Sequence, residues 1–291
     1  LALSLAYSCG EKEPQPQDPP QQEQPDDPVN PDPENPGEPG DEQNPADPNN
    51  YQVRTAQDLV NLATLVNEGT EVKSAMLMND IDMASVTEWV PIGNAVCPAG
   101  ASNADVTGNA WTGIFDGNGF KIKNLKMVAK TATAGENYGL FGVLAPGSLV
   151  QNFIIDASCS LEVTATASLA TGVVAGYVFD ATVRDVTSYA PMTFKGKAGA
   201  VHMTMALIGQ VYCKDGGVTV DSCHNYGEIN AENTDNLEAG AKAYHIAGIV
   251  GFAHALSGST AVNTISDCSN SGNITSATGR SAGIVAACNR N

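Results

Sequence analysis

The chain has 291 residues and a net charge of −18, from 32 acidic and 14 basic side chains. It has no basic stripe that could neutralise phosphates, which argues against nucleic acid as a partner and against electrostatic docking on anionic lipid. It holds no run of 18 or more apolar residues, so no transmembrane helix is predicted.

The first nine residues, LALSLAYSC, run from an apolar stretch into one cysteine. The stretch is too short to span a bilayer, and we expect it to be the end of a secretory signal. An apolar run that ends in small residues before a cysteine is typical of bacterial lipoproteins; Ala6 and Ser8 fit this pattern and Tyr7 departs from it. We therefore predict that Cys9 carries the lipid that anchors a secreted protein to the outer membrane, and that this anchor is its only membrane contact.

Residues 10–50 contain 12 of the 16 prolines, and 12 acidic residues against one lysine. Such a segment has almost no apolar surface to bury and is expected to be a disordered linker. Its start, residues 10–13, resembles the acidic tract that follows the cysteine in lipoproteins that Bacteroides-like bacteria export to the cell surface. That resemblance implies exposure on the outside of the cell.

The folded region, residues 51–291, is predicted to open with a helix, because apolar residues at 59, 62, 63 and 66 lie on one helical face. Thr55 is a suitable N-cap with Asp58 at the third helical position, and Gly69 is a suitable stop. We expect this helix to cover the open end of the repeats that follow, since an exposed parallel edge invites aggregation.

Beyond the helix a four-residue unit recurs, made of a small residue, two apolar residues and another small residue. A second unit, such as VQNF at 150, follows each of the first four occurrences, and an earlier IKNL at 122 is assigned to the same set. The chain ends inside a repeat, so we expect it to be truncated at its C-terminus. The first unit begins at Gly139, Gly172, Ala206, Gly248 and Gly283.

Stacking the second unit produces two apolar columns with a polar position between them. Apolar and polar residues that alternate over short runs predict strands. Strands that recur at this interval predict an all-β fold, a parallel solenoid of five or six coils. A β-propeller is the alternative, disfavoured because each repeat offers about three strands and not four. The columns are Ile122, Val150, Val183, Val220 and Ile265, and Leu125, Phe153, Val186, Cys223 and Cys268.

The repeats resemble a known family, the GLUG-repeat β-helix proteins, which are named for the unit seen here at 139–142. Such repeats occur in adhesin-like surface proteins of Bacteroides-type bacteria and in the non-catalytic region of immunoglobulin-A-cleaving peptidases. The resemblance covers about residues 51–291 and implies a right-handed parallel β-helix on the outside of a cell. It does not imply a ligand. The segments that carry it are AQDLVNLATLVNEG, MLMNDIDM, WVPIG, WTGIFDGNGFKIKNL and YGLFG.

Catalytic chemistry is not predicted. No histidine lies in an HExxH motif, so zinc peptidase chemistry is not expected. A polysaccharide lyase or glycosidase would need clustered carboxylates, for which Asp80, Asp82 and Asp116 are the candidates. We expect Asp116 to cap the tight turn at 117–119, and Asp80 and Asp82 to lie on a solvated strand face opposite Ile81.

The cysteines and tryptophans of the folded region have structural interpretations. Cys223 and Cys268 are expected to be buried free thiols, with a disulfide between them as the less favoured alternative. Cys213, Cys223 and His224 lack the paired spacing of a metal site, and neither a metal nor another cofactor is predicted. Trp89 and Trp111 are expected to pack in the core or cap, with a sugar-stacking role as the alternative.

The sequence therefore predicts a non-enzymatic, lipid-anchored surface β-helix that acts in adhesion by binding a host protein or glycan. Two insertions, residues 94–110 and 230–243, are candidate binding loops or loops without a role. Two alternatives stay open. One is a structural stalk that displays a missing C-terminal domain, and the other is a polysaccharide lyase or glycosidase.

Overall fold

The computed structural model describes residues 47–97, 106–130, 135–164, 169–195, 202–231, 243–276 and 280–290, which belong to one compact unit. The predictions for the signal remnant, for Cys9 and for residues 10–46 of the linker lie outside the described residues. So does most of the second insertion, residues 232–242.

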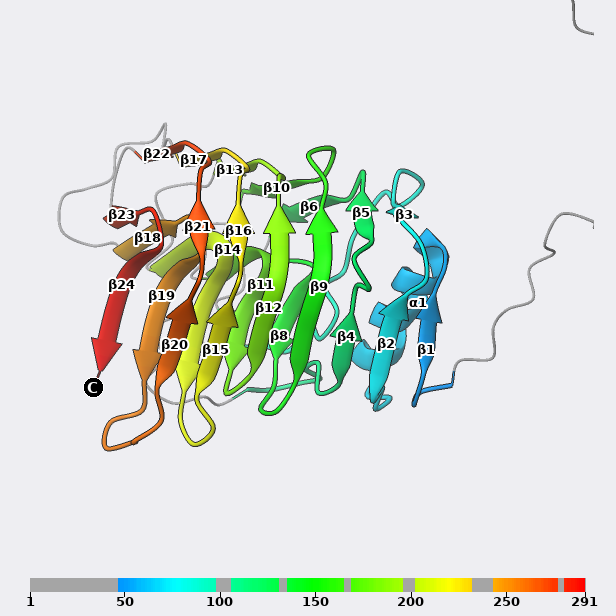
Figure 1. Cartoon of the computed structure of the whole chain (residues 1–291), viewed down its shortest axis with the longest axis horizontal. Helices are drawn as coiled ribbons and strands as arrows, with labels where there is room; N and C mark the ends of the chain where they lie inside the picture. The colour runs from blue at the N-terminus through cyan, green and yellow to red at the C-terminus, as the bar shows by residue number, and fades with distance from the viewer. Residues whose placement is uncertain are drawn as a thin grey trace, which may run out of the picture. The chain divides into compact units, whose positions relative to one another are not determined.

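The fold is a parallel β-helix in which three sheets wrap one core (Figure 1). Every strand pairs with its neighbours in parallel, so the predicted solenoid is confirmed and the propeller is excluded. The front sheet contains β1 (Tyr51–Val53), β2 (Ser74–Leu77), β3 (Ile81–Asp82), β4 (Ile114–Asp116), β5 (Lys121–Lys123), β9 (Leu149–Ile155), β12 (Thr182–Ser188), β15 (Val218–Asp221), β16 (His224–Asn225), β20 (Asn263–Ser266) and β21 (Ser269–Asn270).

Two further sheets complete each coil. The top sheet contains β6 (Lys126–Ala129), β10 (Ser160–Val163), β13 (Met192–Phe194), β17 (Ile229–Ala231) and β22 (Ile274–Ser276). The bent sheet contains β7 (Asn137–Tyr138), β8 (Phe141–Leu144), β11 (Leu169–Phe179), β14 (His202–Cys213), β18 (Ala243–Ala247), β19 (Val250–Ala255), β23 (Arg280–Ala282) and β24 (Val285–Arg290).

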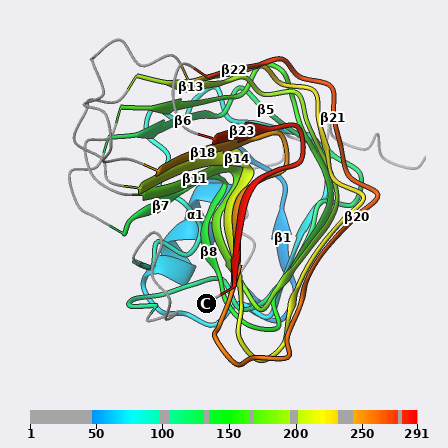
Figure 2. The same cartoon turned by 90° about the vertical axis from the view of Figure 1, so that its left-hand side faces the viewer.

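The handedness follows from the path of the last coil. Figure 2 views the stack from its C-terminal end, and the chain runs counter-clockwise from β20 through β21, β22 and β23 to β24. Earlier coils lie behind and later coils lie nearer the viewer. A chain that turns counter-clockwise as it approaches the viewer forms a right-handed helix, as expected.

Equivalent side chains lie over one another along the axis. Val183 pairs with Val220, and Val220 pairs with Ile265. The buried column is seven strands deep in the front sheet, more than the five or six coils expected, because β1 and β2 extend the stack. It comprises Tyr51, Ala75, Phe115, Val150, Val183 and Val220, which are buried, and Ile265, which is partly buried.

Ile122 and Leu125 do not belong to these columns, so their predicted register is wrong. Ile122 pairs with Ile155, and Leu125 lies beside Cys159, with its N–H 3.4 Å from the Cys159 Sγ. Phe115 takes the place opposite Val150. The reason is the FDGNG turn, which makes the corner in this coil and delays the IKNL segment until the next straight stretch.

The polar position between the columns is a corner and not part of an alternating strand. Val150 and Phe153 are both buried although three residues apart, which strict alternation would place on opposite faces. The intervening Asn152 has a left-handed backbone with φ of 61°, which turns the chain so that both side chains face inward. Asn and Asp tolerate this conformation better than other side chains. The same φ region is used at Asn124, Asp185, Ser222 and Asp267.

The four-residue unit of the repeats forms the corner of the bent sheet. Its two apolar residues, such as Leu207 and Ile208, are both fully buried in the core. The small residues allow the two arms of the sheet to approach each other closely. One alignment changes, because Ala175 pairs with Phe141 and Ile208 across a bulge. The column of Gly142 and Gly209 therefore passes through Gly176, and the second repeat carries one extra residue.

The predicted capping helix is α1 (Ala56–Asn67). Thr55 Oγ1 accepts the Asp58 N–H and the Asp58 carboxylate accepts the Thr55 N–H, so the capping box is complete. Leu59, Leu62, Ala63 and Val66 are buried in the main core. The helix lies beside β1 and β2 at the N-terminal end of the stack (Figure 1), as expected of a cap.

Candidate functional site

The paired carboxylates of the lead-in coil hold coils together. Asp80 forms an ion pair with Lys123 at 2.6 Å and accepts the Lys121 N–H at 2.9 Å, and these hydrogen bonds lower the pKa of Asp80. Asp82 accepts the Asn124 side-chain amide at 2.8 Å and the Ala84 N–H at 3.0 Å, which lower the pKa of Asp82. A general acid needs a raised pKa, so these groups do not suit that role.

Asp116 begins a ladder of polar side chains across the outer face of the front sheet. Its carboxylate accepts the Asn118 N–H at 2.7 Å, which is the predicted turn cap, and the Gln151 side-chain amide at 2.7 Å. Arg184 donates from Nε to the Gln151 Oε1 at 2.8 Å. One coil further, Asp221 accepts the Ser266 hydroxyl at 2.6 Å. The three bonds between side chains join neighbouring coils, so the outer face carries side chains that are already ordered.

Tyr189 and Tyr226 form an exposed pair at the end of this face. Their rings stack with centroids 5.0 Å apart and planes 14° from parallel, and the residues are 44% and 46% exposed. They directly follow the paired residues Ser188 and Asn225, so they occupy equivalent positions in adjacent coils. These two tyrosines were not predicted as functional residues from the sequence. The signal was available, since both tyrosines sit two positions after the corresponding Thr187 and His224.

The cysteines are not brought together in a metal site. Cys213 and Cys223 are buried in the core, and His224 binds the Ser269 hydroxyl through Nδ1 at 2.9 Å. In the described part of the chain no cluster of three or more potential metal ligands occurs. Cys223 and Cys268 are free thiols, as expected, but only Cys223 is fully buried and Cys268 is partly buried. A hydrogen bond between them raises the pKa of Cys223 and lowers that of Cys268.

Both tryptophans pack inside the molecule and are not available as sugar-stacking platforms. The Trp89 indole donates from Nε1 to the Gly139 carbonyl at 3.0 Å and is almost fully buried. Trp111 is fully buried, with its ring 5.8 Å from that of Phe141. The indoles therefore fix the lead-in coil to the first full coil.

The first insertion covers the outer face of the bent sheet where it is described. Val96 and Thr107 form an antiparallel bridge, and Ala95 and Cys97 are buried against Tyr177 and its neighbours. Burial raises the pKa of the Tyr177 hydroxyl far above its usual range. The described ends of this insertion thus have a packing role that was not predicted.

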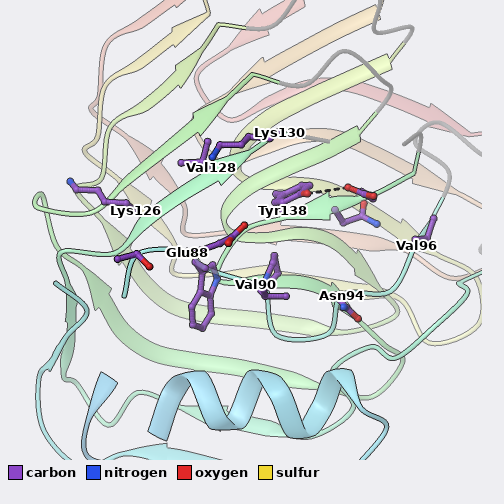
Figure 3. Close-up of a pocket in the computed structure, with 13 residues that line it drawn as sticks. Glu88, Val90, Asn94, Val96, Lys126, Val128, Lys130 and Tyr138 are labelled. Atoms are coloured by element: carbon purple, nitrogen blue, oxygen red, sulfur yellow. Dashed lines mark hydrogen bonds between the residues drawn. The ribbon is translucent and has the colours of Figure 1, made fainter. Parts of the chain in front are cut away.

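A pocket of about 480 Å³ lies between the segment 87–96 and the strands β6 and β7 (Figure 3). Val90 and Val96 contribute apolar surface, Lys126 and Lys130 contribute positive charge, and Glu88 and Glu136 contribute negative charge. The Lys126 ammonium also donates to the Ser158 carbonyl of the next coil at 2.6 Å. Tyr138 donates a hydrogen bond to the Glu136 carboxylate at 3.0 Å. Burial is the larger cause and this hydrogen bond the smaller cause that together raise the pKa of Tyr138 to about 12. This pocket was not predicted from the sequence.

Comparisons with known proteins add little. No family model and no curated protein matches the chain. A similar solved structure is named "putative immunoglobulin A1 protease" and comes from Bacteroides ovatus. It is 16% identical, with a TM-score of 0.38, over 84% of this chain and 85% of that chain. A likeness this low carries no argument about function. Among the described residues, none forms a helix with the length and hydropathy that a membrane span requires.

Proposed function

We propose that this chain is a lipid-anchored β-helix of the cell surface that binds a host protein or glycan through the outer face of its front sheet. The observation that carries the proposal is the exposed pair Tyr189 and Tyr226, which directly follow β12 and β16 of the sheet that bears the ordered polar ladder. Large aromatic side chains that stay half exposed contribute less to folding stability than they would in the core. Two of them at equivalent positions of adjacent coils therefore favour a role in binding.

The polar ladder supports binding because its side chains are held in place before a ligand arrives. Gln151 joins Asp116 to Arg184, so three neighbouring strands present fixed hydrogen-bonding groups. Fixing such side chains beforehand lowers the conformational entropy lost on association. An aromatic ring adds a surface for the C–H face of a pyranose ring, and the tyrosine hydroxyls add hydrogen-bonding groups.

Catalysis is the less favoured function. The carboxylates considered for acid–base chemistry hold neighbouring coils together, and the pKa values of Asp80 and Asp82 are lowered. Together with the resemblance of the repeats to GLUG-repeat surface proteins, this supports a scaffold that binds rather than one that reacts.

A binding screen of the full chain against host matrix glycoproteins and glycans tests the proposal. We expect saturable binding that weakens about tenfold or more when Tyr189 and Tyr226 are both replaced by alanine, because aromatic anchors dominate interface energies. Val262→Ser, which removes another exposed apolar side chain, is the matched control and should bind normally. Binding that is unchanged in the double variant would contradict the proposed surface, and binding that is absent throughout would favour a stalk.

The anchor is tested separately, by expressing the full-length precursor in a Bacteroides-type host with an alkyne-labelled fatty acid. We expect Cys9 to take up the label, because the preceding residues fit a lipoprotein signal. Cys9→Ala should lose the label and leave the membrane fraction, since no other membrane contact is proposed. Cys288→Ala, at an exposed cysteine of the last coil, is the control that should keep both. A wild-type protein without label would overturn the anchor while leaving the binding face untouched.

A further inference from the structure

The strand β6 is the first strand of the top sheet and has a partner on one side only. The order of that sheet ends with β10 and then β6. In the preceding coil, the described chain leaves the front sheet after Asp82 and next joins a sheet at Ile92, which bridges Phe141. No strand of the described chain lies along the free side of β6. The 480 Å³ pocket lies along this free edge.

The backbone groups on this edge point into the pocket. The carbonyls of Leu125 and Ala129 accept hydrogen bonds from Ser160 and Thr164 in the coil of β10. In a parallel ladder the N–H and C=O groups of one residue face one side, and those of the next residue face the other. The backbone groups of Lys126, Val128 and Lys130 therefore face away from β10. These are also the three residues of β6 and its end that line the pocket.

A second group in the pocket lacks a hydrogen-bond partner. Asn137, on the first strand of the bent sheet, is 4% exposed and lines the pocket. Its Nδ2 donates to the carbonyls of Ala95 and Gly135 at 3.3 and 2.9 Å, which fixes Oδ1 as the remaining acceptor. Oδ1 is buried with no partner. A buried acceptor left unpaired costs roughly 1–3 kcal/mol, and a ligand that supplies an N–H removes this cost.

We propose that this edge binds an extended acidic peptide of a partner protein, which adds to the top sheet as one more strand beside β6. Strand addition satisfies the free N–H and C=O groups of Lys126 and Val128. Alternate peptide side chains then lie beside Lys126 and Lys130, where carboxylates form favourable cross-strand pairs. The intervening side chains face the apolar wall that contains Val90 (Figure 3).

Two other occupants fit less well. A second copy would bring its own Lys126 and Lys130 against these, and lysines on an edge strand oppose such pairing. The linker of this chain is acidic, but 12 prolines within residues 10–50 interrupt the N–H groups that a ladder needs.

Two acidic residues also line the pocket and limit the charge that it favours. Glu136 is hydrogen bonded to the Tyr138 hydroxyl, and Glu88 lies on the wall across from β6 (Figure 3). The acidic residues of the peptide therefore belong at the positions beside the lysines, with uncharged residues between them. The peptide TEVTVET, with its glutamates four residues apart, matches the spacing of Lys126 and Lys130.

Fluorescence anisotropy with labelled TEVTVET and the full chain tests this proposal. Two N-methylated versions of the peptide, each blocking alternate amides, separate strand addition from other contacts. We expect one version to bind at least about tenfold more weakly and the other to bind normally, because only alternate amides of an added strand face β6. Failure of TEVTVET to bind, or equal effects of both methylation patterns, would overturn the proposal.

Protein variants give an independent test. Val128→Pro removes an N–H that faces the pocket, at an edge position where proline is tolerated, and Val128→Thr keeps it. We expect a loss of about tenfold or more for the proline variant and little change for threonine. Lys126→Glu with Lys130→Glu should also weaken binding, while Lys214→Glu at a distant turn should not. If Val128→Pro does not fold, the lysine variants and methylated peptides still decide, and unchanged binding in the lysine variants overturns the acidic specificity.

Discussion

Replacing Gly209 with alanine is expected to lower the free energy of unfolding by about 3 kcal/mol, the upper range for overpacking a tight interior. A β-carbon on Gly209 would lie 2.6 Å from the Gly176 carbonyl oxygen and 2.7 Å from both the backbone N and O of Thr171. All three contacts are with backbone, so no side-chain rotation relieves them. The arms of the bent sheet would have to separate at this corner. Because Gly176 and Thr171 belong to the preceding coil, the contact between the two coils would be disturbed as well.

The measurement is urea denaturation of the variant and wild type, followed by circular dichroism. Gly283→Ala is the control, because Gly283 is the first small residue of the repeated unit in the last coil and a β-carbon there meets nothing within 4 Å. It should cost less than about 1 kcal/mol. Equal stability of the two variants would contradict the account of the repeated unit as a tightly closed corner.

The stacking of the later coils could be predicted because the sequence repeats its apolar residues at the same place in each turn. Val183, Val220 and Ile265 each lie in the front sheet and in register, as expected. The first coil could not be aligned in the same way. Its FDGNG turn and the left-handed Asn118 form the corner that Asn152 forms alone in the next coil, and this shifts Ile122 by one stretch.

The bulge in the second repeat shows a different limit. The sequence Gly172-Val173-Val174-Ala175 matches the repeated unit, but Ala175 pairs with Ile208 and Gly176 occupies the tight corner. The second repeat has one additional residue in the bulge, but its sequence still matches the repeated unit because Ala175 and Gly176 are both small. Only the backbone contacts at the corner distinguish them: a β-carbon at 176 would lie 2.7 Å from the Tyr138 nitrogen.

The free edge of β6 could not be predicted from the sequence, because the edge is free only where the preceding described coil forms no strand beside β6. The segment Val86-Thr87-Glu88-Trp89-Val90 has β-branched and aromatic residues that favour a strand. In the structure it forms none, and the Trp89 indole instead binds the Gly139 carbonyl of the bent sheet. This long-range contact leads the chain past the top sheet directly to Ile92, and the pocket is the space that remains.

Stability is expected to fall by about 2 kcal/mol between pH 7 and pH 5 because of His254 alone. The residue is 3% exposed, and burial lowers the pKa of His254 to about 4. Its ring contacts Gln210, Tyr212 and Phe252, none of which supplies a negative charge to stabilise the protonated form. Protonating it would place an uncompensated charge in a buried site.

The direction follows from the two pKa values. The unfolded chain has an ordinary histidine that binds a proton as the pH falls through about 6.5, while the folded chain does not bind one until about pH 4. Acid therefore favours the unfolded state throughout that window. The contribution is fully present above pH 7 and is lost progressively as the pH falls to 4, below which this group adds no further change.

Urea denaturation of the wild type and His254→Gln at pH 7, 6 and 5 measures the effect. The variant should lose about 2 kcal/mol of the pH dependence over this range, whatever the substitution costs at pH 7, because the difference in slope reports proton binding and not packing. Val262→Ser, which changes no ionisable group at an exposed position, is the control and should keep the wild-type slope. A slope that is the same in His254→Gln and wild type would show that the imidazole binds its proton equally well in both states, and would remove His254 as the origin of any acid sensitivity.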